Sequence, residues 1–114
     1  MSSFRKHVIE AKTKYGQGDY EGASRACKSA LMYNADGDGN PQFFLLQAKI
    51  MRELKDKEEA MKAATKALEL APKLMPALTL LGEVFLEDGK KDDYRRILER
   101  QLVIGKPILE ILCF

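Results

Sequence analysis

The residues best suited to chemistry in this chain of 114 residues are one acidic loop, one histidine and two cysteines. The loop, NADGDGNPQFFL over residues 34–45, places oxygen donors at alternate positions, as calcium loops do: Asn34, Asp36 and Asp38. The twelfth position of such a loop holds a bidentate glutamate, and this chain has Leu45 there. Pro41 also stiffens the stretch that would wrap around the ion. We therefore interpret the loop as an acidic turn and predict no metal site.

The histidine and the cysteines lack the partners that catalysis needs. His7 has no carboxylate or cysteine at a catalytic spacing, which favours a packing or surface role. Cys27 stands in a row of alanines, which indicates a buried thiol, and with Cys113 it forms neither a metal-binding spacing nor a disulfide framework. The stretch GQGDYEG, residues 16–22, lacks the lysine and the preceding strand of a phosphate-binding loop. The sequence therefore predicts no catalytic residue, no cofactor and no enzyme.

Composition and charge restrict the class of protein. Hydrophobic residues make up 46% of the chain, enough for the core of one small domain. Charged residues make up 32%, and the net charge of +2 does not favour a nucleic-acid or membrane-surface protein. The start MSSFRKHVIEAK lacks the apolar stretch of a secretory signal, and no segment approaches the ~20 apolar residues of a membrane span. Two free thiols fit a reducing compartment, so we expect a cytoplasmic protein without a membrane partner, with the nucleus as the alternative location.

Helices must position these residues, because the apolar periodicity is helical almost everywhere. Apolar or small residues recur at steps of three and one in two segments: Ala23, Ala26, Cys27, Ala30 and Leu31, and then Ala60, Ala63, Ala64, Ala67 and Leu68. Asn40 before Pro41, and Asp56 three residues before Glu59, are typical of helix starts. The pattern predicts helices over residues 3–16, 19–32, 41–54, 57–70, 75–88 and 91–104, with a short last helix from Pro107. The turns between them are short, so neighbouring helices are expected to pack antiparallel.

A repeat runs through the predicted helices. The row Ala23, Cys27 and Ala30 maps onto Ala60, Ala64 and Ala67 at a shift of 37 residues, whereas Ala48 maps onto Gly82 at a shift of 34. The three extra residues fall in the loop DGDGN, residues 36–40, and leave both flanking helices intact. Three hairpins at this spacing predict an array in which each unit buries its face on the next. We place repeats at about 4–37, 41–74 and 75–108 of a single domain, 1–114, with a tail over 107–114.

These residues resemble the tetratricopeptide repeat family over almost the whole chain. The resemblance is carried by Ala11, Gly18, Asp19, Tyr20, Ala23 and Ala30 in the first unit, by Ala48, Ala60, Ala67 and Pro72 in the second, and by Leu81, Gly82, Phe85 and Gly89 in the third. It implies an all-α fold of three antiparallel helix-turn-helix hairpins, stacked in a right-handed superhelical array. Small residues at the hairpin crossings let the backbones approach closely. His7 replaces a large aromatic of the family, and Tyr94 replaces an alanine, so the third crossing is expected to be wider.

The resemblance also implies a binding groove, because the first helix of each hairpin lines a concave surface in this family. The groove positions are Arg5, Val8, Lys12 and Tyr15, then Gln42, Leu45, Lys49 and Arg52, then Pro76, Thr79, Glu83 and Leu86. One end of this groove is expected to be basic, through Arg5, Lys12, Lys49 and Arg52, and the other acidic, through Glu83, Glu87 and Asp88. An ordinary mixed surface is the alternative. The predicted function is a protein-interaction scaffold that holds an acidic, partly apolar segment or helix of a partner, within a larger assembly.

The same residues bear on two other classes of partner, chaperone tails and RNA. Family members that bind the carboxyl-terminal tails of chaperones use a clamp of lysine, asparagine and arginine, and the matching places here are Val8, Lys12, Leu46, Pro76 and Leu80. Only Lys12 could contribute, which argues against such tails. An RNA-contacting module, with Arg5, Lys12, Lys49, Arg52 and Lys55 at phosphates, is the alternative function, and a weak similarity to the amino-terminal repeats of the superkiller-complex scaffold points the same way. The apolar tail KPILEILCF is expected to pack on a longer array or on a partner, or to cause self-association.

Overall fold

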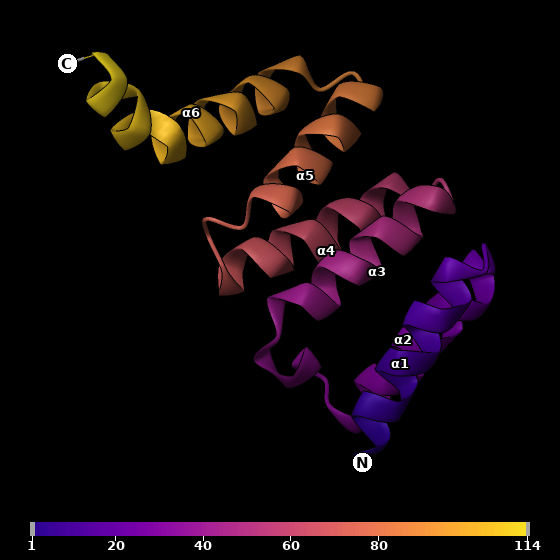
Figure 1. Cartoon of the computed structure of the whole chain (residues 1–114). Helices are drawn as coiled ribbons and strands as arrows, with labels where there is room; N and C mark the ends of the chain where they lie inside the picture. The colour runs from indigo at the N-terminus through magenta and orange to yellow at the C-terminus, as the bar shows by residue number, and fades with distance from the viewer. Residues whose placement is uncertain (1, 114) are drawn as a thin grey trace.

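Helical hairpins make up the described part of the chain. The computed structural model describes the backbone of residues 2–113 and the side chains of residues 2–104. Within this part there are helices and no strand: α1 (Ser3–Gly16), α2 (Tyr20–Tyr33), the short 3-10 turn η1 (Gly37–Gly39), α3 (Pro41–Glu53), α4 (Lys57–Leu70), α5 (Met75–Glu87) and α6 (Lys91–Cys113) (Figure 1). The all-α prediction is confirmed, and the first five predicted helices agree with the structure to within one residue at each end.

Side chains that accept backbone hydrogen bonds fix the starts of four helices. The bonds run from Arg5 N to Ser2 Oγ (3.2 Å), from Gly22 N to Asp19 Oδ1 (3.0 Å), from Gln42 N to Asn40 Oδ1 (2.9 Å) and from Glu59 N to Asp56 Oδ1 (3.2 Å). Each cap satisfies an N–H group that has no partner inside its helix and stabilises the helix by about 1 kcal/mol. The predicted starts at Asn40 and Asp56 are therefore confirmed.

The same backbone conformation turns the chain inside each hairpin. Gly18, Lys55 and Gly89 occupy equivalent places between the paired helices, and their φ angles are +80°, +65° and +74°. Positive φ suits glycine, because a side chain at this conformation meets its own backbone. The second hairpin therefore makes its turn with a lysine in a conformation that costs free energy.

The rows of small residues lie at the hairpin crossings, as the sequence predicts. All six residues of the two matching rows have no exposed surface: Ala23, Cys27, Ala30, Ala60, Ala64 and Ala67. The core continues from α1 to α6 through larger side chains, of which Ile50, Leu78 and Val84 are fully buried. The molecule is elongated, with extents of 50 × 32 × 24 Å and a radius of gyration of 15.6 Å, above the ~13 Å of a compact globule of this length. An elongated shape of this kind is typical of a repeat array rather than of a compact globular domain.

The third hairpin is more open than the other two. Figure 1 shows α1 beside α2 and α3 beside α4, whereas α6 diverges from α5 along its length. α5 approaches α6 closely at Gly82, where a Cβ atom would lie 3.1 Å from Cγ2 of Ile97 and 3.6 Å from Cδ1 of Tyr94. Tyr94 lies at this point of close approach, so the wider crossing expected there stays a prediction.

The last helix differs from the prediction. α6 is one helix from Lys91 to Cys113, and no separate helix begins at Pro107. A proline removes one backbone hydrogen bond and can kink a helix without ending it, and α6 changes direction in its last part (Figure 1). The apolar side chains of the tail lie outside the described residues, so self-association through them stays a prediction, as do the repeat boundaries. No helix within the described residues is long and apolar enough to cross a membrane.

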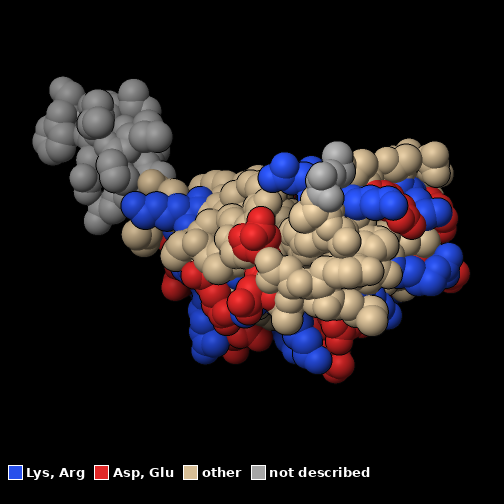
Figure 2. Space-filling model, turned by 90° about the horizontal axis from the view of Figure 1, so that it is seen from below, with Lys and Arg blue, Asp and Glu red and all other residues tan. Residues whose placement is uncertain are grey.

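Charges of both signs share the surface. On the face that Figure 2 shows, Lys and Arg side chains are interspersed with Asp and Glu, and uncharged areas lie between them. This mixture agrees with the net charge of +2. This face therefore presents no continuous patch of one sign.

Candidate functional site

A hollow of about 510 Å³ lies where the first helices of the three hairpins face one another. Its walls come from the end of α1, the end of α3 and most of α5. The lining residues are Tyr15, Lys49, Arg52, Glu53, Met75, Pro76, Thr79, Leu80 and Glu83. The lining thus combines aromatic and aliphatic surface with basic, acidic and hydroxyl side chains, a combination that is typical of ligand sites in proteins.

Half of the predicted groove residues meet in this hollow. The structure brings together six of the twelve from three helices: Tyr15, Lys49, Arg52, Pro76, Thr79 and Glu83. Three lining residues were missed: Glu53, Met75 and Leu80. Glu53 lies four residues after Lys49, and Met75 lies four residues before Thr79, so the helical period that found their neighbours could have found both.

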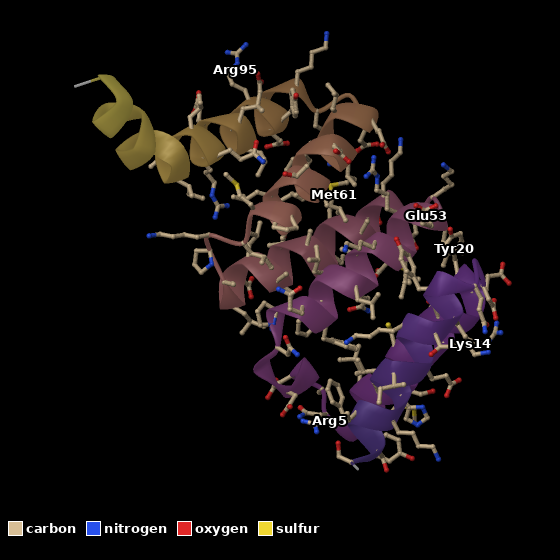
Figure 3. The ribbon with its side chains drawn as sticks, viewed as in Figure 1. Arg5, Lys14, Tyr20, Glu53, Met61 and Arg95 are labelled. Carbon is tan, nitrogen blue, oxygen red and sulfur yellow. The ribbon has the colours of Figure 1, made fainter. Side chains whose placement is uncertain are left out.

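The other six predicted residues, Gln42 at the start of α3 among them, lie outside the hollow. Arg5, Val8 and Lys12 belong to earlier turns of α1, and Figure 3 shows Arg5 at the opposite end of that helix from the corner that holds Glu53. Val8 is half-buried and packs against the core. Leu86 is 49% exposed and lies three residues beyond Glu83. These residues could extend the surface beside the hollow but do not line it.

Leu45 requires a correction. It was expected in the groove, but its side chain is only 4% exposed and belongs to the core. The reason is the central place of α3, which packs on α1 and α2 as well as on α4 and α5. The buried side of this helix is therefore wider than one stripe, and it takes in Phe43, Phe44 and Leu45 together.

Arg52 joins α3 to α5 by ion pairs inside the hollow. One guanidinium nitrogen donates to Glu87 Oε1 at 2.7 Å, and the other donates to Glu83 Oε2. The Lys57 ammonium adds a hydrogen bond of 3.2 Å to the Glu87 carbonyl oxygen. The groove was expected to run from a basic end at Arg52 to an acidic end at Glu83 and Glu87. That gradient is wrong at this place, because the opposite charges are in contact.

Both partners of this cluster are held in their charged forms. The hydrogen bond to Glu87 raises the pKa of Arg52, with Glu83 adding to the effect. The hydrogen bond from Arg52 likewise lowers the pKa of the Glu87 carboxyl below its ordinary value. Charge-assisted bonds of this kind are stronger than neutral ones. The positive charge of Arg52 is therefore already paired with carboxylates before any ligand binds.

Two other groups that line the hollow keep hydrogen-bonding capacity. Lys49 is exposed, and no acidic side chain among residues 2–104 is within ion-pair distance of its ammonium. Burial, with a smaller contribution from Glu53, raises the pKa of the Tyr15 phenol, which therefore stays a donor at neutral pH. The rings of Tyr15 and Tyr20 lie 5.6 Å apart, and Figure 3 shows Tyr20 and Glu53 at the same corner, where α3 ends.

Cys27, His7 and the acidic loop have structural roles. Burial raises the pKa of the Cys27 thiol to about 11, which keeps it un-ionised and unreactive at neutral pH. The His7 ring stacks on Tyr33 with centroids 5.5 Å apart. In the acidic loop, Asn34 Oδ1 accepts a hydrogen bond from Asp36 N at 3.2 Å, so this oxygen stabilises the turn. No group of three or more metal-binding side chains occurs within the described residues.

Two solved structures have the same fold. The crystal structure of MamA protein superposes with a TM-score of 0.82 and 13% sequence identity, over 94% of this chain and 57% of that one. The second TPR of Spaghetti (RPAP3), bound to an HSP90 peptide of sequence SRMEEVD, superposes with a TM-score of 0.78 and 18% identity, over 90% of this chain and 93% of that one. The chain therefore has the tetratricopeptide-repeat fold, as predicted, and it spans 57% of the length of the MamA chain.

No family model and no curated relative matches the sequence. At these identities the two structures show the fold alone. The similarity to the superkiller scaffold stays a prediction.

Proposed function

We propose that this chain is a protein-interaction module that holds a short segment of a partner protein in the hollow between α1, α3 and α5. The observation that carries the proposal is the pairing of apolar walls with unsatisfied polar groups. Met75, Pro76 and Leu80 provide an apolar surface, and the ammonium of Lys49 and the phenol of Tyr15 line the same hollow. A peptide bound to a neighbour with the same fold supports the general role.

The ion pairs of Arg52 with Glu83 and Glu87 restrict which groups of a ligand the hollow can bind. Arg52 is occupied by Glu83 and Glu87, so the free ammonium of Lys49 is the group that would receive a ligand carboxylate. The best ligand therefore has one acidic residue beside an apolar anchor, in an extended or helical segment. Charge would speed association, and burial of the anchor would slow release.

A chaperone tail such as SRMEEVD is a poor match for this hollow. Its acidic residues call for several basic or amide side chains, and the expected clamp positions Val8, Leu46, Pro76 and Leu80 offer no side-chain donor. Pro76 and Leu80 instead form part of the apolar wall. We propose a ligand distinct from that of the peptide-bound neighbour.

A displayed peptide library tests the proposal. Peptides selected on the wild-type chain should lose at least tenfold in affinity for Lys49→Glu, with helical circular dichroism unchanged, because Lys49 is exposed. The matched control is Lys62→Glu on the outer side of α4, whose side chain is 73% exposed and which should retain binding. The peptide SRMEEVD should bind at least tenfold more weakly than the selected peptides. Equal losses from Lys49→Glu and Lys62→Glu would mean that only net charge matters, and the hollow would not be the site.

The RNA-contacting alternative has less support. Phosphates require free basic groups in a continuous stripe, whereas Arg52 is neutralised and the charges in Figure 2 are interspersed. Binding to RNA would show as a steep loss of affinity with salt, and such a loss would favour this alternative.

A further inference from the structure

We propose a second docking surface on α6, which accepts an amphipathic helix of another protein. The proposal rests on a comparison of the three hairpins with one another, and it is independent of the hollow. α4 begins at Lys57 and α6 at Lys91, so each position of α4 has its counterpart 34 residues later on α6. Residues at equivalent positions can therefore be compared directly for exposure.

One row of the second helix is buried in the first two hairpins. In α2 the row is Ser24, Cys27 and Leu31, in α4 it is Met61, Ala64 and Leu68, and in α6 it is Arg95, Leu98 and Leu102. α3 packs on α2, and α5 packs on α4. Ala64 is completely buried and Leu68 is 6% exposed, whereas Leu98 is 40% and Leu102 is 63% exposed. The third row thus has the residues of an interface, and no helix covers it within the part of the chain that the structure describes.

The direction of the labelled side chains agrees with this difference. Met61 is partly buried against the core between α4 and α5, and its counterpart Arg95 points away from the other helices (Figure 3). Leu98 and Leu102 lie one and two turns after Arg95, so the exposed row changes from basic to apolar along α6. Two exposed leucines on one stripe favour an apolar partner surface.

Charge indicates the kind of helix that fits. Lys91 and Arg95 are exposed at the beginning of this row, and neither is paired with an acidic side chain among residues 2–104. A helix that covers Leu98 and Leu102 with apolar residues would therefore gain from acidic residues at the end that faces Lys91 and Arg95. The occupant we infer is an amphipathic helix with an apolar stripe and an acidic end.

A second copy of this chain fits the row poorly. Leu78, Leu81 and Phe85 of α5 pack into the core, and the last two line a hollow together with Leu68 of α4. Stacking of two copies end to end would place α1 there instead. The α1 residues at the equivalent positions are His7, Glu10 and Lys14. Covering Leu98 and Leu102 with these polar groups would bury charge against apolar surface, which is unfavourable. The inferred occupant is therefore a helix from a different protein.

The test uses a helix that already covers such a row. A fluorescein-labelled peptide of residues 74–89, which spans α5, is titrated into the full chain and followed by anisotropy. We expect saturable binding that falls at least tenfold in the variant Leu98→Glu, Leu102→Glu. The matched control is Val103→Glu on the adjacent side of α6, since Val103 is 67% exposed and its variant should bind within twofold of the wild type. Binding that falls in Lys49→Glu but not in Leu98→Glu, Leu102→Glu would instead place the peptide in the hollow.

Three results would overturn the inference. The first is the absence of saturable binding by the peptide. The second is equal binding by the wild type and by the Leu98→Glu, Leu102→Glu variant, with circular dichroism showing that both are folded. The third is sedimentation of the wild-type chain as a dimer that dissociates in this variant, because a second copy would then be the occupant.

Discussion

Removal of the Arg52 guanidinium tests how strongly one ion cluster holds α3 and α5 together. The substitution Arg52→Met keeps an unbranched side chain and removes both bonds to α5, whereas Glu87→Gln removes one of them. The side chains of Arg52 and Glu87 are 34% and 45% exposed, so water screens the pair despite its separation of 2.7 Å. We therefore expect a coupling free energy of about 0.5–1 kcal/mol, far below the 3–5 kcal/mol cost of breaking a buried pair. The corresponding fall in Tm is roughly 2–6 °C.

A double-mutant cycle measures this coupling by urea denaturation of four proteins: the wild type, Arg52→Met, Glu87→Gln and the double variant. The folded-state pKa of Glu87 lies below its ordinary value, so its stabilisation is complete above the unfolded-state pKa. It is lost as the pH falls through the folded-state pKa, because protonation removes the charge. The coupling should therefore be complete at pH 7 and shrink as the pH falls below the ordinary carboxyl range. It should also shrink in high salt.

The pair Lys62 and Glu59 provides the control for the cycle. It lies on one helix with 3.5 Å between the charged atoms, and its side chains are 73% and 50% exposed. Its coupling should be near zero, or at most about 0.5 kcal/mol. If the coupling of Arg52 with Glu87 were no larger than this at pH 7, or unchanged at low pH, the cluster would not hold the two helices together.

Three further predictions concern stability and reactivity. Ala60 is completely buried at the crossing of α3 and α4, so Ala60→Leu should overpack it and lower the free energy of unfolding by ~1–3 kcal/mol in chemical denaturation. Glu58 is exposed, and Glu58→Leu should change this free energy little. The reverse order would contradict the hairpin assignment. Lys55→Gly should stabilise the chain by up to about 1 kcal/mol in the same assay, because it relieves a residue at φ +65°, and a loss of stability would contradict this. Cys27 should react with iodoacetamide at pH 7.5 far more slowly in the folded Cys113→Ser variant than in urea, because burial raises its pKa to about 11, and equal rates would contradict its burial.

Spacing made most of the fold predictable from the sequence. The rows of small residues mark hairpin crossings, since Ala60 and its equivalents must lie where two backbones approach closely. The capping residues Asn40 and Asp56 fixed two helix starts to the residue. The end of α6 was predicted wrongly because Pro107 suggested a boundary, although a long helix can continue through a proline.

The site was harder to predict because it depends on contacts between distant residues. Arg52 pairs with residues 31 and 35 positions further along the chain, and no local pattern reveals a partner so far away. Leu45 was misplaced because the width of the buried side of α3 is set by how many helices surround it. Tyr15, Lys49 and Thr79 were found because one helical stripe per hairpin suffices to align them.

The order of the helices bears on how the chain folds during synthesis. Each helix packs mainly on the one before it and the one after it, and η1 lies in the long connection that joins the first hairpin to the second. Contacts so close in sequence require little loop closure, which is typical of helical proteins that fold in microseconds to milliseconds. Translation adds residues far more slowly, at about 5–20 per second. α1 and α2 can therefore close on each other while α3 is still inside the ribosome, and each later hairpin meets a partner that is already in place.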